Sequence, residues 1–72
     1  MNNEKVVKWL SSRICDFCNE ECKDDLYDAM TIYGPWATMC KKHFKLLSNN
    51  LGPGRGQHYK RNEQGEFVKV EG

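Results

Sequence analysis

Two short motifs decide the fold of this 72-residue chain: Cys15-Asp-Phe-Cys18 and Cys40-Lys-Lys-His43. Two residues separate the members of each pair, so both side chains can point inward from one tight turn or from the first turn of a helix. Each pair then supplies two corners of a tetrahedron. Thiolate and imidazole suit Zn²⁺, and four such ligands close its coordination shell. The spacing predicts one structural zinc ion, without an open position for activating water, held by Cys15, Cys18, Cys40 and His43.

Other ligand sets remain open at this point. Cys22 follows Cys18 at a spacing that also suits a metal ligand, so it can displace Cys15. His58 can replace His43 if the chain folds back, although a histidine in a glycine-rich segment is more often a surface residue. A further alternative is an all-thiolate site formed by Cys15, Cys18, Cys22 and Cys40.

Four cysteines in a small chain also fit disulfide bonds or a redox dithiol. Disulfides require an oxidising compartment, and residues 1–14 lack the apolar centre of an export signal. A redox C-x2-C pair expects a thioredoxin-like βαβ context, which this pattern does not supply. No segment approaches the roughly 20 apolar residues needed to cross a bilayer. We therefore expect a cytoplasmic protein without a membrane partner.

The chain is too small to depend on a hydrophobic core alone. A domain of this size buries only about 60% of the surface that its unfolded chain exposes. Its residues are 39% hydrophobic and 29% charged. Few apolar side chains are therefore available to offset the conformational entropy of folding, on the order of 1.5 kcal/mol per ordered residue. The composition predicts one small domain that needs its metal.

The residues between and after the two motifs predict a hairpin followed by a helix. Residues 26–39 (LYDAMTIYGPWATM) are rich in strand formers, and Gly34-Pro35 interrupts them, with Asp28-Ala29 as a rival turn. From Cys40 the apolar residues recur at helical spacing, which predicts a helix of about ten residues. Its apolar face carries Phe44, Leu47 and Leu51, and its lysines face solvent or a partner.

The two ends of the chain predict short elements. Residues 4–10 (EKVVKWL) fit a short helix somewhat better than a strand, and residues 66–70 (EFVKV) alternate as a strand that could add to the hairpin edge. A knuckle, a hairpin and then a helix follow one another in treble-clef order. The expected fold class is a small α+β zinc-stabilised domain of treble-clef type. It spans residues 1–72, with an N-terminal helix or strand over 1–13, the zinc core over 14–51, and a Gly-rich loop and terminal strand over 52–72.

Charge is balanced overall at +1 but unevenly distributed. Between Cys15 and Cys40 stand six carboxylates against the single Lys23, whereas residues 41–61 carry six lysines and arginines and no carboxylate. The two halves either attract each other or leave a basic binding surface.

The glycine-rich segment 51–61 (LGPGRGQHYKR) is the second informative feature. It lacks the Gly-Lys-Ser/Thr of a Walker loop and the context of a dinucleotide fingerprint. It offers backbone N–H groups, cations and the rings of Tyr59 or His58, a mixture used to bind single-stranded nucleic acid. The alternative is a tight reversal after the helix, with Tyr59 packed into the core. The candidate nucleic-acid-binding residues are Lys41, Lys42, Lys45, Arg55, Gln57, Tyr59, Lys60 and Arg61.

The ordered motifs C-x2-C at 15–18, GPWATMC-x2-H at 34–43 and LG-x-G-x-GQ-x-Y at 51–59 resemble small zinc-finger-like proteins that recur in bacteriophage genomes. The resemblance covers about residues 15–59. It implies Cys15, Cys18, Cys40 and His43 as ligands, and Gly34, Trp36, Gly52 and residues 54–59 as motif positions, and it has no place for Cys22. It also implies a phage origin and a bacterial host cytoplasm, but no activity.

Two functions are carried forward. The first is a non-catalytic zinc-binding module that contacts nucleic acid, mainly through phosphates and without strong sequence preference. The alternative is a protein-interaction module that docks on a host bacterial protein and inhibits or redirects it, with Trp36, Trp9 and Tyr33 as anchors. Against that second role, Trp36 is expected in the core.

Enzymatic activity is not expected. A carboxylate cluster exists at Asp24, Asp25 and Asp28, and His58 is a conceivable base. A paired nucleophile, an open metal position and enough chain for a closed pocket are all missing from the pattern. No small-molecule substrate is expected either.

Overall fold

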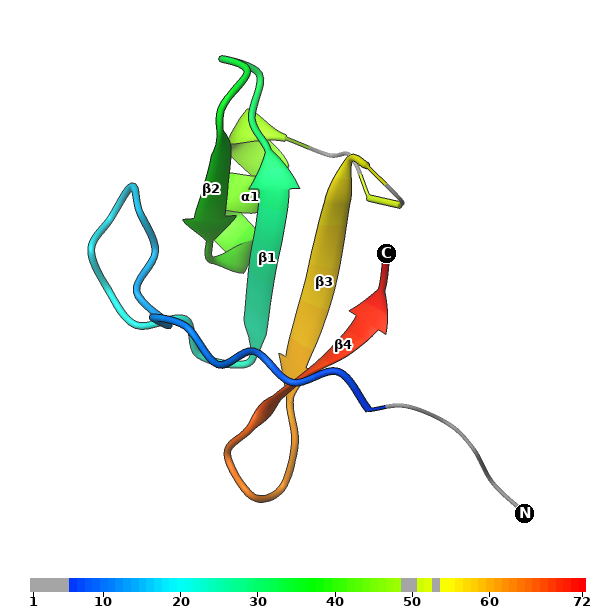
Figure 1. Cartoon of the computed structure of the whole chain (residues 1–72). Coiled ribbons are helices and arrows are strands. Elements are labelled where there is room, and N and C mark those ends of the chain that lie inside the picture. Colours follow the sequence, from blue (N-terminus) through cyan, green and yellow to red (C-terminus); the bar gives the residue numbers. More distant parts are fainter. Residues whose placement is uncertain (1–5, 49–50, 53) are drawn as a thin grey trace.

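In the part of the chain that the structure describes, the fold consists of a four-stranded antiparallel sheet and one short helix (Figure 1). The computed structural model describes residues 6–48, 51–52 and 54–72. The strand order in the sheet is β2-β1-β3-β4. The elements, in chain order, are β1 (Asp25–Met30), β2 (Trp36–Met39), α1 (Lys41–Leu47), β3 (Gly56–Arg61) and β4 (Phe67–Glu71). The predicted α+β class is confirmed.

The predicted hairpin is present, with its turn where Gly34-Pro35 places it. Strands β1 and β2 pair in antiparallel register, with Asp28 opposite Thr38. Thr31 closes the turn because its N–H and its hydroxyl both donate to the carbonyl of Pro35, at 3.0 and 2.8 Å. Gly34 has a φ of 106°, a conformation that costs a glycine little. The rival turn at Asp28-Ala29 is wrong, because both residues lie inside β1.

Helix α1 is shorter than predicted. It covers seven residues rather than about ten, and Asn49 and Asn50, where helix propensity is lost, lie outside the described part of the chain. Phe44 is its buried residue and stacks on Tyr27 of β1, with ring centroids 4.0 Å apart. The hydroxyl of Ser48 donates to the carbonyl of Met30 at 2.6 Å, just past the helix end. A helix this short depends on such packing.

The glycine-rich segment contributes a strand, which corrects the prediction of a loop. Residues 56–61 form β3, and it pairs with β1 on one side and β4 on the other. The predicted last strand exists as β4 but lies against β3 rather than against the hairpin. The reason is that β3 occupies the free edge of β1 and satisfies its backbone N–H and C=O groups.

The N-terminal segment is extended, so the preference for a helix over residues 4–10 is wrong for the part described. The N–H of Trp9 donates to the carbonyl of Phe67 at 2.9 Å, and the N–H of Lys69 donates to the carbonyl of Val7 at 2.8 Å. The outer edge of β4 offers unpaired backbone groups, and pairing with them outweighs a weak helical pattern. Residues 4 and 5 lie outside the described residues.

Two small cores lie on opposite faces of the sheet. Helix α1 covers one face, and the N-terminal segment crosses the other near the start of β1, as Figure 1 shows. Tyr27, Ala29, Met39 and Phe44 form the core beneath the helix. The core on the opposite face consists of Cys15, Cys22, Leu26, Tyr59 and Phe67, with Cys18 and Cys40 packed against it. The cysteines are thus part of the molecule's interior. Helix α1 falls short of the length and apolar character required to cross a bilayer.

Candidate metal centre

The first cysteine pair lies in a tight turn that precedes the sheet. Cys15 donates its N–H to the carbonyl of Glu20 at 2.9 Å, and Cys22 donates to the carbonyl of Arg13 at 2.8 Å, so the two arms run antiparallel. Asn19 has a φ of 61° and donates its N–H to the carbonyl of Cys15. Asparagine tolerates this left-handed conformation better than most residues. The turn brings the thiols of Cys15 and Cys18 to the same side.

The second pair lies where β2 passes into α1. Cys40 is the N-cap residue, in extended conformation, and His43 follows in the first helical turn. The N–H of Phe44 donates to the carbonyl of Cys40 at 2.9 Å, which fixes that turn. A change of direction between a strand and a helix therefore aims both ligands of this pair at one point.

Asp16 joins the two motifs, a role that the spacing of the motifs did not predict. Its carboxylate oxygen Oδ2 accepts a hydrogen bond from the N–H of Thr38 at 2.8 Å. Its own N–H donates to the carbonyl of Thr38, also at 2.8 Å. The turn that carries Cys15 and Cys18 is thereby fastened to the end of β2, next to Cys40.

The four predicted ligands lie together and could hold a metal ion. Their ligand atoms are all within 4.8 Å of one another. Nδ1 of His43 is 3.5 Å from Sγ of Cys15 and 3.3 Å from Sγ of Cys40. Zinc bonds of about 2.3 Å to sulfur and about 2.0 Å to nitrogen, at tetrahedral angles, place S and N about 3.5 Å apart. The geometry and the donor set both fit one zinc ion.

The thiols of this cluster influence one another. Burial opposes ionisation of Cys15, but hydrogen bonds from the backbone N–H groups of Cys40, Cys18 and Phe17 outweigh it and lower the pKa to about 7. At Cys18 the backbone N–H of Glu20 lowers the pKa, yet burial and the neighbouring Cys15 and Cys40 together raise it. The surroundings therefore favour the thiolate form of Cys15 and oppose a second thiolate at Cys18. A bound cation removes that conflict because it stabilises every thiolate around it.

The alternative ligand sets are not assembled by the fold. Cys22 is fully buried beside Leu26, and burial followed by the nearby sulfurs raises its pKa to about 12. It therefore acts as an apolar core residue. Nε2 of His58 lies 2.7 Å from Oδ1 of Asp25, and its ring stacks on Tyr27 with centroids 4.2 Å apart. All four cysteines are free thiols, so none of them forms the disulfides considered above.

A groove of about 450 Å³ lies beside the cluster. Three ligands, Cys18, Cys40 and His43, line it. The other lining residues are charged: four are acidic (Glu20, Glu21, Asp24 and Asp25) and three are basic (Lys23, Lys41 and Lys42). The acidic and basic halves of the sequence therefore meet in space here, and the carboxylates weaken the field of the first two helix lysines.

Several candidate nucleic-acid residues are engaged within the protein. Tyr59 is 4% exposed, its hydroxyl donates to Oε1 of Gln57 at 2.6 Å, and its ring lies 5.3 Å from that of Trp9. The prediction of Tyr59 as a stacking surface is wrong, and the alternative in which it packs into the core is confirmed. The six-residue strand β3 pairs on both sides, and its buried residues are Gly56 and Tyr59.

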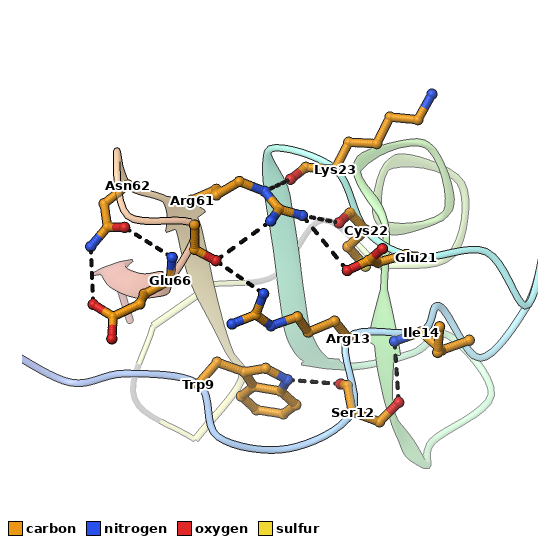
Figure 2. Close-up of polar contacts among 11 residues, drawn as sticks. Trp9, Ser12, Arg13, Ile14, Glu21, Cys22, Lys23, Arg61, Asn62 and Glu66 are labelled. Carbon is orange, nitrogen blue, oxygen red and sulfur yellow. Dashed lines mark hydrogen bonds and ion pairs between the residues drawn. The ribbon is translucent and has the colours of Figure 1, made fainter.

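Arg61 is a structural residue, which its sequence context did not indicate (Figure 2). Its guanidinium donates to the carbonyls of Lys23 and Cys22 and lies 4.7 Å from the centre of the Phe67 ring. Arg13 lies over the same ring and donates to the carbonyl of Gly65 at 3.0 Å. The two arginines connect the cysteine-bearing turn to the hairpin between β3 and β4.

The remaining candidate nucleic-acid-binding residues are exposed, and so is Trp36, which was expected in the core. Lys41, Lys42, Lys45, Arg55 and Lys60 are exposed. Trp36 is 45% exposed, so its prediction as a core residue is wrong. Ala37 and Met39 of β2 face the helix, so Trp36, the first residue of β2, points to the opposite face of the sheet.

Comparisons of the chain with protein-family models, with curated proteins and with solved structures find no match. The functional conclusion therefore depends on the geometry of the cysteine and histidine cluster and on the surface around it.

Proposed function

We propose that this chain is a non-catalytic binding module stabilised by one structural zinc ion in a treble-clef-like arrangement. The observation that carries the proposal is the convergence of Cys15, Cys18, Cys40 and His43. A turn supplies the first pair, a hairpin follows, and the start of a helix supplies the second pair, which is the treble-clef order. Four protein ligands complete the zinc shell and leave its chemistry structural.

Native mass spectrometry of the purified protein tests the metal site. We expect one zinc ion per chain, lost in Cys18→Ser and in His43→Ala. Cys22→Ala is the matched control, because it removes a buried thiol outside the cluster and should keep full zinc occupancy. Equal zinc loss in Cys22→Ala, or a metal-free wild-type protein, would contradict the proposed site.

We further propose that the module binds nucleic acid through its exposed cations. Residues 29–62 contain six lysines and arginines and no carboxylate, and five of these cations are exposed. Phosphate contacts release counterions, so affinity for an oligonucleotide should fall steeply with salt. Charge reversal at Lys41, Lys45, Arg55 and Lys60 together should abolish binding in fluorescence anisotropy. Binding that survives this variant would exclude these cations as the binding surface.

A second candidate is docking on a bacterial host protein, and the groove beside the metal cluster favours it. Glu20, Asp24, Lys41 and Lys42 line the groove and form no ion pair with any residue in the described parts of the chain. A partner surface carrying both signs of charge would complement them. A pull-down from nuclease-treated bacterial lysate tests this role. The partner should be retained by the wild type and lost by Asp24→Lys and by Lys42→Glu, and equal recovery with these variants would exclude the groove.

A further inference from the structure

Three segments distant in sequence are joined at one end of the molecule, where the turn between β1 and β2 meets the end of α1 (Figure 1). The N–H of Ile32 donates to the carbonyl of Leu47 at 2.7 Å. The N–H of Met30 donates to the carbonyl of Arg55, just before β3, at 3.0 Å. We call this region the hairpin end and define it by its exposed residues Ile32, Tyr33, Trp36, Lys45, Leu46 and Arg55.

The hairpin end leaves large apolar side chains in water. Tyr33 is 71% exposed and Trp36 is 45% exposed, and they stand three residues apart around the turn. Ile32 and Leu46 are 67% and 63% exposed. Backbone pairing brings these residues to one end of the molecule, where Trp36 points to the face opposite α1 and Leu46 lies on α1 itself. Exposed apolar groups at one end commonly mark a binding surface. Two of these four are aromatic rings, which are side chains on which bases can stack.

The charges at the hairpin end are positive. Lys45 and Arg55 are exposed and form no ion pair with any described residue. Asp28 lies inside β1 and Glu71 lies on β4, so neither carboxylate belongs to the hairpin end. Lys41 and Lys42 differ, because they share their groove with four carboxylates.

We propose that the hairpin end binds single-stranded nucleic acid, with bases stacked on Tyr33 and Trp36 and phosphates held by Lys45 and Arg55. This inference rests on the proposed nucleic-acid function and assigns its surface. A nucleic acid strand offers aromatic faces and negative charge together, which is the complement of this end. A second copy of the chain fits poorly, because it would bring like charges together. Tyr59 and His58 do not compete for the bases, because the Tyr59 ring is buried in a tilted contact with Trp9 and the His58 ring is stacked on Tyr27.

Tryptophan fluorescence gives a direct test, because the chain has only two tryptophans. In zinc-loaded Trp9→Phe, Trp36 is the sole reporter, and a stacked base should quench its emission. In Trp36→Phe, Trp9 reports from its contact with the buried Tyr59, away from the hairpin end, and should show no quenching. The probe is an oligothymidylate of about 15 nucleotides, long enough for one small binding site. Saturating oligonucleotide that leaves Trp36 emission unchanged would overturn the proposal.

Affinity measurements by anisotropy separate the two kinds of contact. Tyr33→Ala and Trp36→Ala should each weaken binding about five-fold or more, through lost stacking. Lys45→Glu and Arg55→Glu should weaken binding and also lower the slope of log affinity against log salt by about 0.7 each. Lys23→Glu, at the groove, is the matched control and should bind as the wild type does. Thermal unfolding of each variant shows that the fold is retained.

The outcomes distinguish a failure of the assigned surface from a failure of the proposed nucleic-acid function. A wild-type protein that binds no oligonucleotide overturns both, including the case in which it binds anionic phospholipid vesicles instead. A wild-type protein that binds, but loses affinity through Lys41→Glu, Lys42→Glu or Lys60→Glu and not through the hairpin-end variants, overturns the assigned surface and leaves the nucleic-acid function standing.

Discussion

Single residues outside the candidate ligand set fix the relative positions of the two ligand pairs. Asp16 bonds to Thr38 through both its carboxylate and its N–H, and so places the turn of Cys15 and Cys18 against Cys40. Groups that orient metal ligands commonly affect metal affinity by about 10-fold to 100-fold when they are removed. Asp16 has the position, though not a direct ligand contact, to act in this way.

We therefore expect Asp16→Ala to weaken zinc binding by about ten-fold, because the turn loses its carboxylate link to β2. Competition with a chromophoric chelator measures the affinity. Asp16→Asn keeps an oxygen acceptor for the N–H of Thr38 and should recover most of it. Asp24→Ala is the control, because it removes another exposed carboxylate, one that makes no such bond. Equal affinity in Asp16→Ala and Asp24→Ala would show that the link does not position the ligands.

Asp28 and Glu66 should make opposite contributions to the pH dependence of the free energy of unfolding. Burial raises the pKa of Asp28, so its ionised form is less favourable in the folded state, and it subtracts stability as pH rises through the unfolded pKa. A hydrogen bond from Lys8, followed by one from Asn62, lowers the pKa of Glu66. That carboxylate adds stability above its unfolded pKa, which is lost as pH falls through its folded pKa.

Asp28→Asn should consequently raise the midpoint of thermal unfolding at neutral pH, and Glu66→Gln should lower it. Both differences from wild type should shrink as pH falls below the carboxyl range, where the native side chains are protonated too. Comparing each variant with wild type at the same pH cancels the effect of acid on the zinc ligands. A stabilisation by Asp28→Asn that persists unchanged in acid would point to a cause other than its ionisation.

Elements of this protein depend on their neighbours more than on their own sequences. Helix α1 has seven residues, far below the roughly 12 to 15 at which an isolated helix becomes even marginally stable. It is held by Cys40 and His43 at its start and by the stack of Phe44, Tyr27 and His58 along its buried side. The cysteine-bearing turn is held by Arg61 of β3, whose guanidinium donates hydrogen bonds to the carbonyls of Cys22 and Lys23.

We expect Arg61→Ala to lower the free energy of unfolding by about 2 kcal/mol, because two carbonyls lose a charged donor and the Phe67 ring loses its cation. Urea denaturation of the zinc-loaded protein measures the change. Lys60→Ala is the matched control, since Lys60 is the exposed neighbour on the same strand and should have an effect within about 0.5 kcal/mol. Similar losses in both variants would assign the effect of Arg61 to general charge.

At the scale of the whole molecule, the two cores are small and lie on opposite sides of one sheet. Cys15 belongs to one core, and Cys40 leads directly into the helix that covers the other. The candidate metal ligands therefore connect both layers to the sheet. A metal ion bound at the cluster would join the turn of Cys15 and Cys18 to the start of α1.

Removal of zinc by a strong chelator should therefore abolish cooperative unfolding of the whole chain, because metal binding free energy is folding free energy in small metal-stabilised domains. Scanning calorimetry before and after chelation measures this, and restoring zinc should restore the transition. A metal-free protein with an unchanged transition would show that the two cores suffice without the metal.

The sequence alone determined the parts of this protein that depend on local spacing. Two C-x2-C/H pairs predict their four ligands because short separations limit where the side chains can point, and Gly34-Pro35 predicts its turn because few residues adopt that backbone. Helix α1 was predictable from its apolar period, although not its length. The pattern also indicated the α+β class.

Only the tertiary structure decided which strands pair and which side chains are buried. The glycine-rich segment forms strand β3, and the described N-terminal residues pair with β4 rather than forming a helix. Tyr59 is buried, and Trp36 is exposed. Each outcome depends on which sheet edge is free and which face another segment covers, and these are contacts between residues distant in the chain. Asp16 and Arg61 show the same limit, because a single polar residue gives no sign in sequence of the distant backbone group that it will bind.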